Sequence, residues 1–172
     1  AYYYFNDTDY VMGAIHRGWN AVGSPGHAPG FAIAGSKKIS DEWTLTGNYY
    51  GGDETAIADE SGKYRHFFDV VALYNPSRYK KWSFAFNGDL GFQGGSSVFA
   101  VSAQAKYIVT PKSYATFRGE FIIDDGFIGT DAYSLTAGYA YQFNKYFQTR
   151  AELRYDFASS DVFFGSNRGS FR

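Results

Sequence analysis

The segment Thr149-Arg150-Ala151-Glu152-Leu153-Arg154-Tyr155-Asp156-Phe157 alternates between uncharged and charged residues without a break. In an extended strand, successive side chains point to opposite faces. One face of this segment would then be apolar, ending in two aromatic rings, and the other would carry four charges of alternating sign. No helical arrangement gathers these charges on one side. The segment therefore predicts a β-strand that separates two unlike environments.

The composition agrees with a chain built of strands and turns. The 172 residues correspond to about one domain. Aromatic residues make up 21% of the chain and glycine occurs 20 times, which favours strands and tight turns over helical bundles. The 16 basic and 17 acidic residues nearly balance, at a net charge of −1, and this argues against nucleic acid as a partner.

Several classes of protein are excluded by what the sequence lacks. Without cysteine there are no disulfides, no cysteine-based zinc sites and no thiol catalysis. No run approaches the ~18 apolar residues that a transmembrane helix needs. The chain starts at Ala1 without a methionine or a recognisable signal peptide, so we read it as a processed or partial chain.

Nine segments alternate in the manner of strands, and each has roughly 9 to 12 residues. Strands of soluble proteins usually have ~5–6 residues, whereas tilted strands that cross a bilayer need ~9–11. The predicted strands are Tyr10–Asn20, Phe31–Ile39, Trp43–Gly51, Tyr64–Asn75, Trp82–Gln93, Val98–Val109, Tyr114–Ile123, Asp131–Phe143 and Thr149–Phe157. Ala1 to Asp9 receives no assignment.

The connections and the aromatic residues favour a membrane protein. Short turns alternate with longer segments along the chain, and only the tight connection at Gly94–Ser97 breaks the alternation. Aromatic residues gather near strand ends, as in the aromatic girdles of outer-membrane barrels. The sequence predicts an all-β fold, a transmembrane antiparallel up-and-down β-barrel in a single domain over residues 1–172. A soluble sandwich or lipocalin-like barrel is the alternative.

A sheet that spans a bilayer must close, because every backbone polar group needs a partner there. Nine strands leave an open edge. We therefore expect the nine strands to be part of a larger barrel whose final strand would follow Arg172. A complete small barrel of eight to ten strands is the alternative.

Short motifs along the chain resemble one family. They are Phe68-Asp69-Val70-Val71-Ala72-Leu73-Tyr74-Asn75-Pro76, Lys106-Tyr107, Arg118-Gly119-Glu120-Phe121, Asp124-Asp125-Gly126 and Arg150 to Asp156. Together they are similar to the C-terminal part of the OmpL-like beta-barrel porin family of Gram-negative outer membranes, from about Trp43 to Phe164. The resemblance implies a porin-like role and names no solute. The family's last strand with a terminal aromatic residue is missing from this sequence.

The polar side chains of the predicted strands form the candidate site. We expect pore-lining positions at Asp69, Asn87, Asp89, Gln104, Lys106, Arg118, Glu120, Arg150, Glu152, Arg154 and Asp156. Small residues on the strand before Thr149 leave room for long side chains from both neighbouring strands to meet. Such charges either filter solutes by charge and size or pair along the wall and stiffen it.

The favoured function is passive diffusion of small polar solutes or ions through a water-filled lumen in the bacterial outer membrane. Expected partners are outer-membrane lipid, lipopolysaccharide and those solutes, with a homo-oligomer or an envelope protein as further options. A non-conducting barrel that acts as a scaffold or docking protein is the alternative.

We expect no enzyme activity, no cofactor and no metal. His16, His27 and His66 show neither metal-ligand spacing nor a serine partner, and ordinary strand or loop positions account for them. Two acidic loops, Gly52–Lys63 and Asp124–Asp131, match no full calcium-loop pattern. They are either plain solvated loops or sites where divalent ions bridge to lipopolysaccharide.

Overall fold

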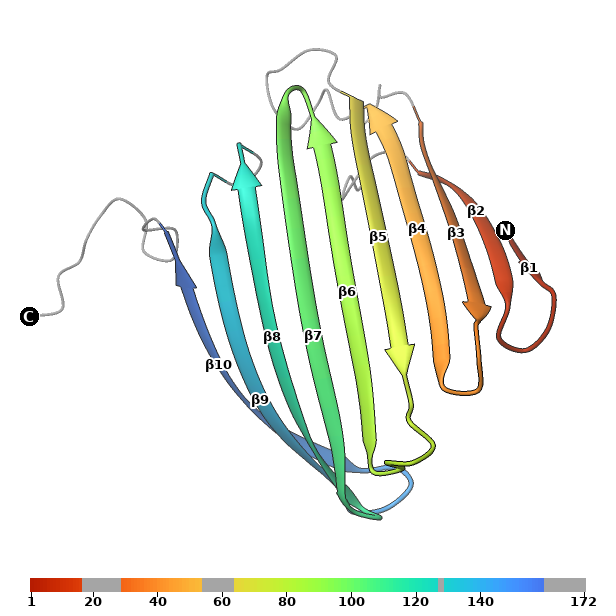
Figure 1. Cartoon of the computed structure of the whole chain (residues 1–172), viewed down its shortest axis with the longest axis vertical. Coiled ribbons are helices and arrows are strands. Elements are labelled where there is room, and N and C mark those ends of the chain that lie inside the picture. Colours follow the sequence, from red (N-terminus) through yellow and green to blue (C-terminus); the bar gives the residue numbers. More distant parts are fainter. Residues whose placement is uncertain (17–28, 54–63, 127–128, 160–172) are drawn as a thin grey trace, which may run out of the picture.

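In the computed structural model of the chain, residues 1–16, 29–53, 64–126 and 129–159 are described. Ten antiparallel strands form one sheet in which each strand pairs with its neighbours in sequence (Figure 1). The strands are β1 Tyr2–Tyr4, β2 Tyr10–His16, β3 Gly30–Lys38, β4 Trp43–Asp53, β5 Tyr64–Tyr74, β6 Trp82–Gln93, β7 Ser96–Thr110, β8 Ser113–Asp125, β9 Ala132–Gln142 and β10 Gln148–Ala158. The described residues include no helix long and apolar enough to cross a membrane.

The nine predicted strands are present as β2 to β10, and the sheet has one strand more. Tyr2–Tyr4 forms β1 and pairs antiparallel with the start of β2, with Tyr2 opposite Met12 and Tyr4 opposite Tyr10. Tyrosine suits a strand, and the rings of Tyr2 and Tyr10 pack at 5.6 Å between centroids. The prediction missed β1 because three tyrosines in a row do not alternate.

Some strand ends differ from the predicted ones. β4 continues to Asp53 and β8 to Asp125, so both acidic segments begin inside strands. β7 begins at Ser96 because Gly94 and Gly95 alone turn the chain, with φ of 57° and 93°. Positive φ at both turn positions is what a tight hairpin requires and what glycine permits. The predicted strand end at Asn20 and most of the predicted Gly52–Lys63 loop lie outside the described residues.

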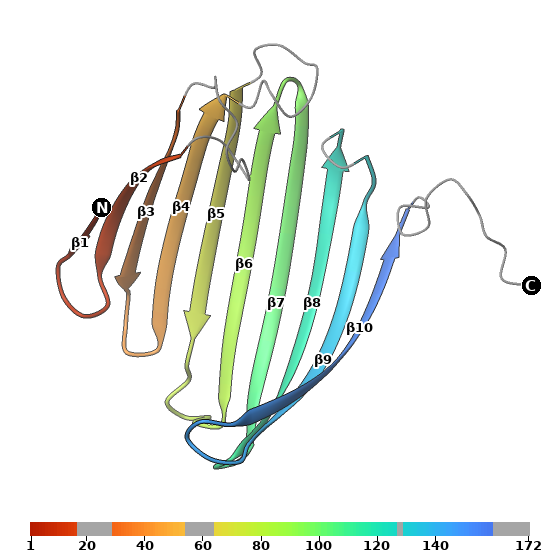
Figure 2. The ribbon, with the colours of Figure 1, turned by 180° about the vertical axis from the view of Figure 1, so that it is seen from behind.

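The sheet is curved and open. The turn between β9 and β10 passes behind the other strands in Figure 1 and in front of them when the sheet is seen from behind in Figure 2, so the sheet curls strongly at this side. Within the described residues β1 and β10 are the two edges and do not pair with each other. A curled, open, up-and-down sheet is consistent with the prediction of part of a larger barrel.

The two faces of the sheet differ in both chemistry and exposure. On β9, Leu135 is 60% exposed, whereas the next residue, Thr136, is 8% exposed and points to the other face. The apolar face also carries aromatic pairs at both ends of the strands, including Trp82–Tyr107 at 4.7 Å and Tyr133–Phe157 at 5.1 Å. One face is therefore apolar, with aromatic pairs near both ends of the strands, and the other carries the polar and charged side chains, the pattern of membrane-spanning barrels.

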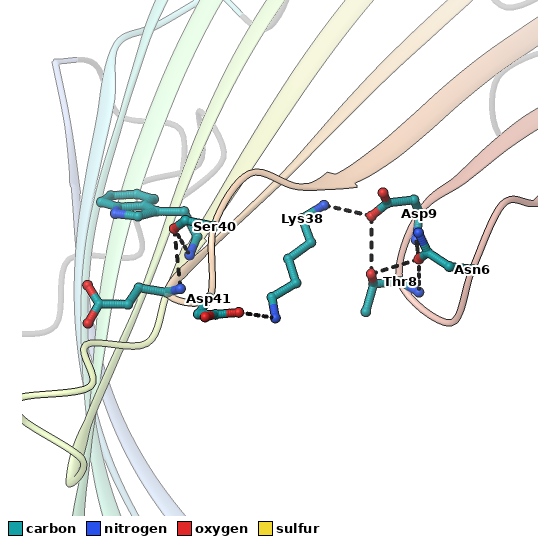
Figure 3. A network of polar contacts seen from close by, with 8 residues as sticks. Asn6, Thr8, Asp9, Lys38, Ser40 and Asp41 are labelled. Atoms are coloured by element: carbon teal, nitrogen blue, oxygen red, sulfur yellow. Dashed lines mark hydrogen bonds and ion pairs between the residues drawn. The ribbon is translucent and has the colours of Figure 1, made fainter.

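Polar contacts hold the connections together at one end of the sheet (Figure 3). The backbone N–H of Lys38 donates to Asp9 at 2.8 Å, which ties the β1–β2 turn to the end of β3. The Lys38 ammonium forms an ion pair with Asp41 at 2.8 Å. The hydrogen bond from the Lys38 backbone N–H is the main cause of the lowered pKa of the Asp9 carboxyl group. The Lys38 side chain is the main cause of the lowered pKa of the Asp41 carboxyl group.

Candidate functional site

The cross-strand register places all eleven predicted lining residues on the polar face. Directly opposed pairs connect them to one another and to small residues of the neighbouring strands. These pairs are Asp69–Asp89, Asn87–Ser102, Gln104–Arg118, Lys106–Thr116, Glu120–Ser134, Arg154–Thr136, Glu152–Gly138, Arg150–Ala140 and Asp156–Ser134. The shared face follows from the period of two in every strand. That the residues line a pore remains a proposal.

A carboxylate–amide cluster, made of Asn48, Asp69, Asn87 and Asp89, lies on β4, β5 and β6. Asp69 accepts hydrogen bonds from both amides, with one carboxylate oxygen facing Asn48 and the other facing Asn87. The Asp89 carboxylate lies on the neighbouring strand directly opposite Asp69. The amides therefore hold a carboxylate that has a second carboxyl group beside it.

Asn48 is the member that the sequence prediction did not include. It is directly opposite Asp69 in the β4–β5 pairing, and its face could be read from the alternation of β4. A hollow of about 480 Å³ adjoins the cluster, and Asn48, Asp69 and Asp89 contribute to its lining together with Tyr50.

Tyr50 is nearly buried at the edge of this hollow, with 7% of its surface exposed. Two glycines make room for its ring. A Cβ atom at Gly30 or at Gly52 would lie 2.6 Å or 2.4 Å from the Tyr50 hydroxyl, closer than such contacts occur. The ring thus packs across the backbones of β3 and β4 and closes one side of the hollow.

A charge ladder occupies β8 and β10 and comprises Arg118, Glu120, Arg150, Glu152, Arg154 and Asp156. Along β10, Arg150 Nη2 lies 2.7 Å from Glu152 Oε2, and Arg154 Nε lies 2.7 Å from Asp156 Oδ1. On β8, Arg118 Nε lies 3.1 Å from Glu120 Oε2. Each arginine therefore pairs with the acidic residue two positions further along its strand.

One ion pair crosses a strand. Arg154 Nη2 on β10 lies 3.2 Å from Glu120 Oε1 on β8, although β9 runs between them. Neighbouring strands are ~4.8 Å apart, so two strand spacings separate these backbones. Ser134 and Thr136 of β9 lie beneath the contact and are 4% and 8% exposed. Arg154 and Glu120 thus meet above the small residues of β9, as the sequence predicts for long side chains from the two neighbouring strands.

Lys106 and Gln104 lie on the same face but outside the ladder. The Lys106 ammonium is 4.3 Å from the centroid of the Tyr114 ring, a cation–π distance. Gln104 is opposite Arg118 in the register. The alternation of the sequence predicts which face of the sheet these two side chains lie on. The contact of Lys106 with Tyr114 depends on the register between β7 and β8, which the alternation does not give.

The histidines and acidic groups show no catalytic or metal-binding arrangement within the described ranges. His66 contacts the Tyr49 hydroxyl through Nδ1 at 2.9 Å, and the His16 ring lies 6.1 Å from the Tyr50 ring. His27 lies outside the described residues. No group of three or more potential metal ligands gathers in the part of the chain that the structure describes.

Long antiparallel strands in up-and-down order, with one apolar face and one charged face, are characteristic of transmembrane β-barrels. The chain belongs to the family described as "Putative beta-barrel porin-2, OmpL-like", whose family model matches residues 1–171. The match extends well beyond the Trp43–Phe164 range of the sequence motifs. It supports a general outer-membrane porin role, and barrels of such families are typically not enzymes. No curated protein and no solved structure matches the chain significantly.

Proposed function

We propose that the chain contributes the wall of an outer-membrane porin through which small polar solutes and ions diffuse passively. The observation that carries this proposal is the polar face shared by β4 to β10, on which charged and amide side chains contact one another across β4, β5 and β6 and between β8 and β10. Charged groups are costly on a lipid-facing surface, whereas a water-filled lumen accommodates them. The aromatic and aliphatic side chains on the opposite face would contact outer-membrane lipid.

The arrangement of charge supports a preference among solutes. The carboxylate–amide cluster carries two carboxylates, Asp69 and Asp89, without a basic residue among its members. The charge ladder carries three arginines and three acidic residues and is neutral as a set. A cation that passes β5 and β6 would therefore meet a negative potential, while the charge ladder on β8 and β10 supplies a field without net charge.

Conductance in planar bilayers tests the proposal. The purified full-length protein should form open channels, and a salt gradient should give a reversal potential that indicates a preference for cations. The double variant Asp69→Asn/Asp89→Asn should shift this reversal potential towards anions, because it removes both carboxyl groups of the cluster and retains the size of the side chains. The control Asp41→Asn removes a carboxylate at an exposed turn and should leave the reversal potential unchanged.

Absence of conductance from correctly folded protein would overturn the proposal. If a stoichiometric envelope protein then co-purified with the chain, the result would favour the alternative of a non-conducting scaffold.

A further inference from the structure

The turn between β5 and β6 concentrates positive charge. Arg78, Lys80 and Lys81, which we call the basic turn, lie within four consecutive residues. No ion pair reaches any of these three side chains from the described residues. At the other short connections, Lys38 forms an ion pair with Asp41. Lys112 and Lys145 are each the single basic residue of their turn. The basic turn is therefore the strongest cationic group at this end of the sheet.

Hydrogen bonds hold the backbone of the basic turn in place. Trp82 N–H donates to the Tyr79 carbonyl at 2.8 Å, and Ile108 N–H donates to the Lys81 carbonyl at 2.8 Å. At the other side of the turn, Ser77 N–H donates to the Glu42 carboxylate at 2.6 Å. Glu42 thus fixes the turn through Ser77 and contacts none of the three cations. The turn is anchored to β6, to β7 and to the β3–β4 connection.

A hollow of about 430 Å³ lies against this turn. Residues 77–81 line it, together with Trp82 and Tyr107. The Trp82 and Tyr107 rings pack at 4.7 Å, and Lys81 Nζ lies 5.9 Å from the Tyr107 centroid. The hollow therefore combines a cationic rim with an aromatic wall, and no acidic residue lines it.

Trp82 and Tyr107 also place the hollow in the membrane. Their side chains lie on the apolar outer face, and the Trp82 ring continues into that face by stacking on Phe84 at 5.8 Å. Tryptophan and tyrosine at strand ends mark the level of lipid headgroups. Arginine and lysine favour phosphate at this level, and arginine can contact it through two N–H groups.

We propose that this hollow binds the phosphate headgroup of an anionic phospholipid, with Arg78, Lys80 and Lys81 around the phosphate and Trp82 and Tyr107 against the start of the acyl chains. The proposal rests on the membrane placement in the proposed function but not on conduction. It assigns a lipid site to the end of the barrel with short turns, which in outer-membrane barrels faces the periplasm.

Native mass spectrometry of the full-length protein tests this site. The protein is reconstituted in vesicles with equal amounts of phosphatidylglycerol and phosphatidylcholine, extracted in mild detergent and analysed for retained lipid. The wild type should retain phosphatidylglycerol selectively. The variant Arg78→Gln/Lys80→Gln/Lys81→Gln should lower this selectivity at least about tenfold, since each basic residue near a lipid surface contributes about fivefold.

The control Lys37→Gln/Lys112→Gln/Lys145→Gln removes three positive charges from the same end and should retain the selectivity. Equal retention by both variants, or equal loss in both, would overturn the proposal, because the effect would then not belong to this hollow. Displacement of the phospholipid by millimolar inorganic phosphate would assign the hollow to free phosphate and overturn the lipid assignment.

If the triple variant does not fold, the single variant Lys80→Gln should still lower the selectivity for phosphatidylglycerol by about fivefold. An unchanged selectivity in that variant would contradict the proposed lipid site. Lipid retention is measured whether or not the protein conducts, so the two proposals fail separately.

Discussion

Two groups of charges share the polar face and are built in opposite ways. In the carboxylate–amide cluster, Asp69 is held by neutral amides from two neighbouring strands while Asp89 lies opposite it. In the charge ladder, arginines and carboxylates pair along their own strands, and Arg154 reaches over β9 to Glu120. The first group keeps a net negative charge in a half-buried setting. The second compensates its charges in a more exposed one.

The difference shows that the neighbouring strand decides which partner a charged side chain on the polar face has. Beside Asp69, the adjacent strands supply hydrogen-bond donors without charge, so the negative charge is stabilised but not neutralised. Beside Arg154, β9 supplies only small side chains, so a charge two strands away can reach it. One polar face can therefore hold a net negative charge at the carboxylate–amide cluster and compensated ion pairs at the charge ladder.

The largest expected effect separates the two groups by stability. Asp69→Ala should lower the free energy of unfolding by about 2 kcal/mol, because two half-buried amides lose their acceptor. Asp156→Ala, its counterpart in the ladder, should cost less than about 1 kcal/mol, since its ion pair is exposed. Urea unfolding in lipid vesicles measures both. Equal losses of unfolding free energy in the two variants would show that the amide hydrogen bonds of the cluster contribute no more to stability than the exposed ion pair of the ladder.

The next effect concerns the small residues beneath the crossing ion pair. Thr136→Phe should lower the stability by about 1 kcal/mol and separate Arg154 from Glu120, because a ring would fill the space that the arginine crosses. The control Leu135→Phe lies on the open outer face of the same strand and should be nearly neutral. Urea unfolding checks the stabilities. An undiminished coupling between Glu120 and Arg154 in the Thr136→Phe protein would contradict this account.

A smaller effect distinguishes ion pairs from amide hydrogen bonds by their response to salt. A double-mutant cycle with Glu120→Gln and Arg154→Gln should give a coupling of about 0.5 kcal/mol at low salt, with most of it lost in 1 M salt, where the Debye length is about 3 Å. A matching cycle with Asn48→Ala and Asp69→Ala should change little with salt. A salt-independent coupling between Glu120 and Arg154 would show that they do not act as an exposed ion pair.

The smallest effect uses a carboxylate outside the sheet as a reference. The Ser77 hydroxyl and N–H donate to Glu42 and lower its pKa below the ordinary value of 4.5. Glu42 therefore contributes stability above pH 4.5 and loses it as the pH falls through the lowered pKa. Between neutral and acidic pH, the urea midpoint of the wild type should fall slightly more than that of Glu42→Gln. Parallel curves for the two proteins would exclude this contribution.

The sequence predicted most of the fold because the strands are long and alternate. Segments such as Trp82–Gln93 leave little doubt about which side chains share a face. β1 was missed because Tyr2–Tyr4 is three residues long and carries the same residue on both faces. Face membership needs only the period of two, whereas a short pairing depends on the strand beside it.

The same limit applies to the candidate site. All eleven predicted residues lie on the polar face, but the partners of several could not be predicted. Asn48 joins Asp69, and Lys106 joins the Tyr114 ring, only because of the alignment of neighbouring strands. The contact between Glu120 and Arg154 depends on two such alignments at once. Cross-strand register is a property of the whole sheet, and local periodicity does not contain it.

The two tightest connections in the sheet join β6, β7 and β8. Two residues separate β6 from β7, and two separate β7 from β8. Closing such short loops costs little chain entropy, and contacts between residues near in sequence form fastest. Three strands with one apolar face are also the smallest sheet with independent stability. During folding into the membrane, we expect residues 82–125 to form the nucleus on which the other strands assemble outward in both directions, and its glycine turn at Gly94–Gly95 to set the register of the whole wall.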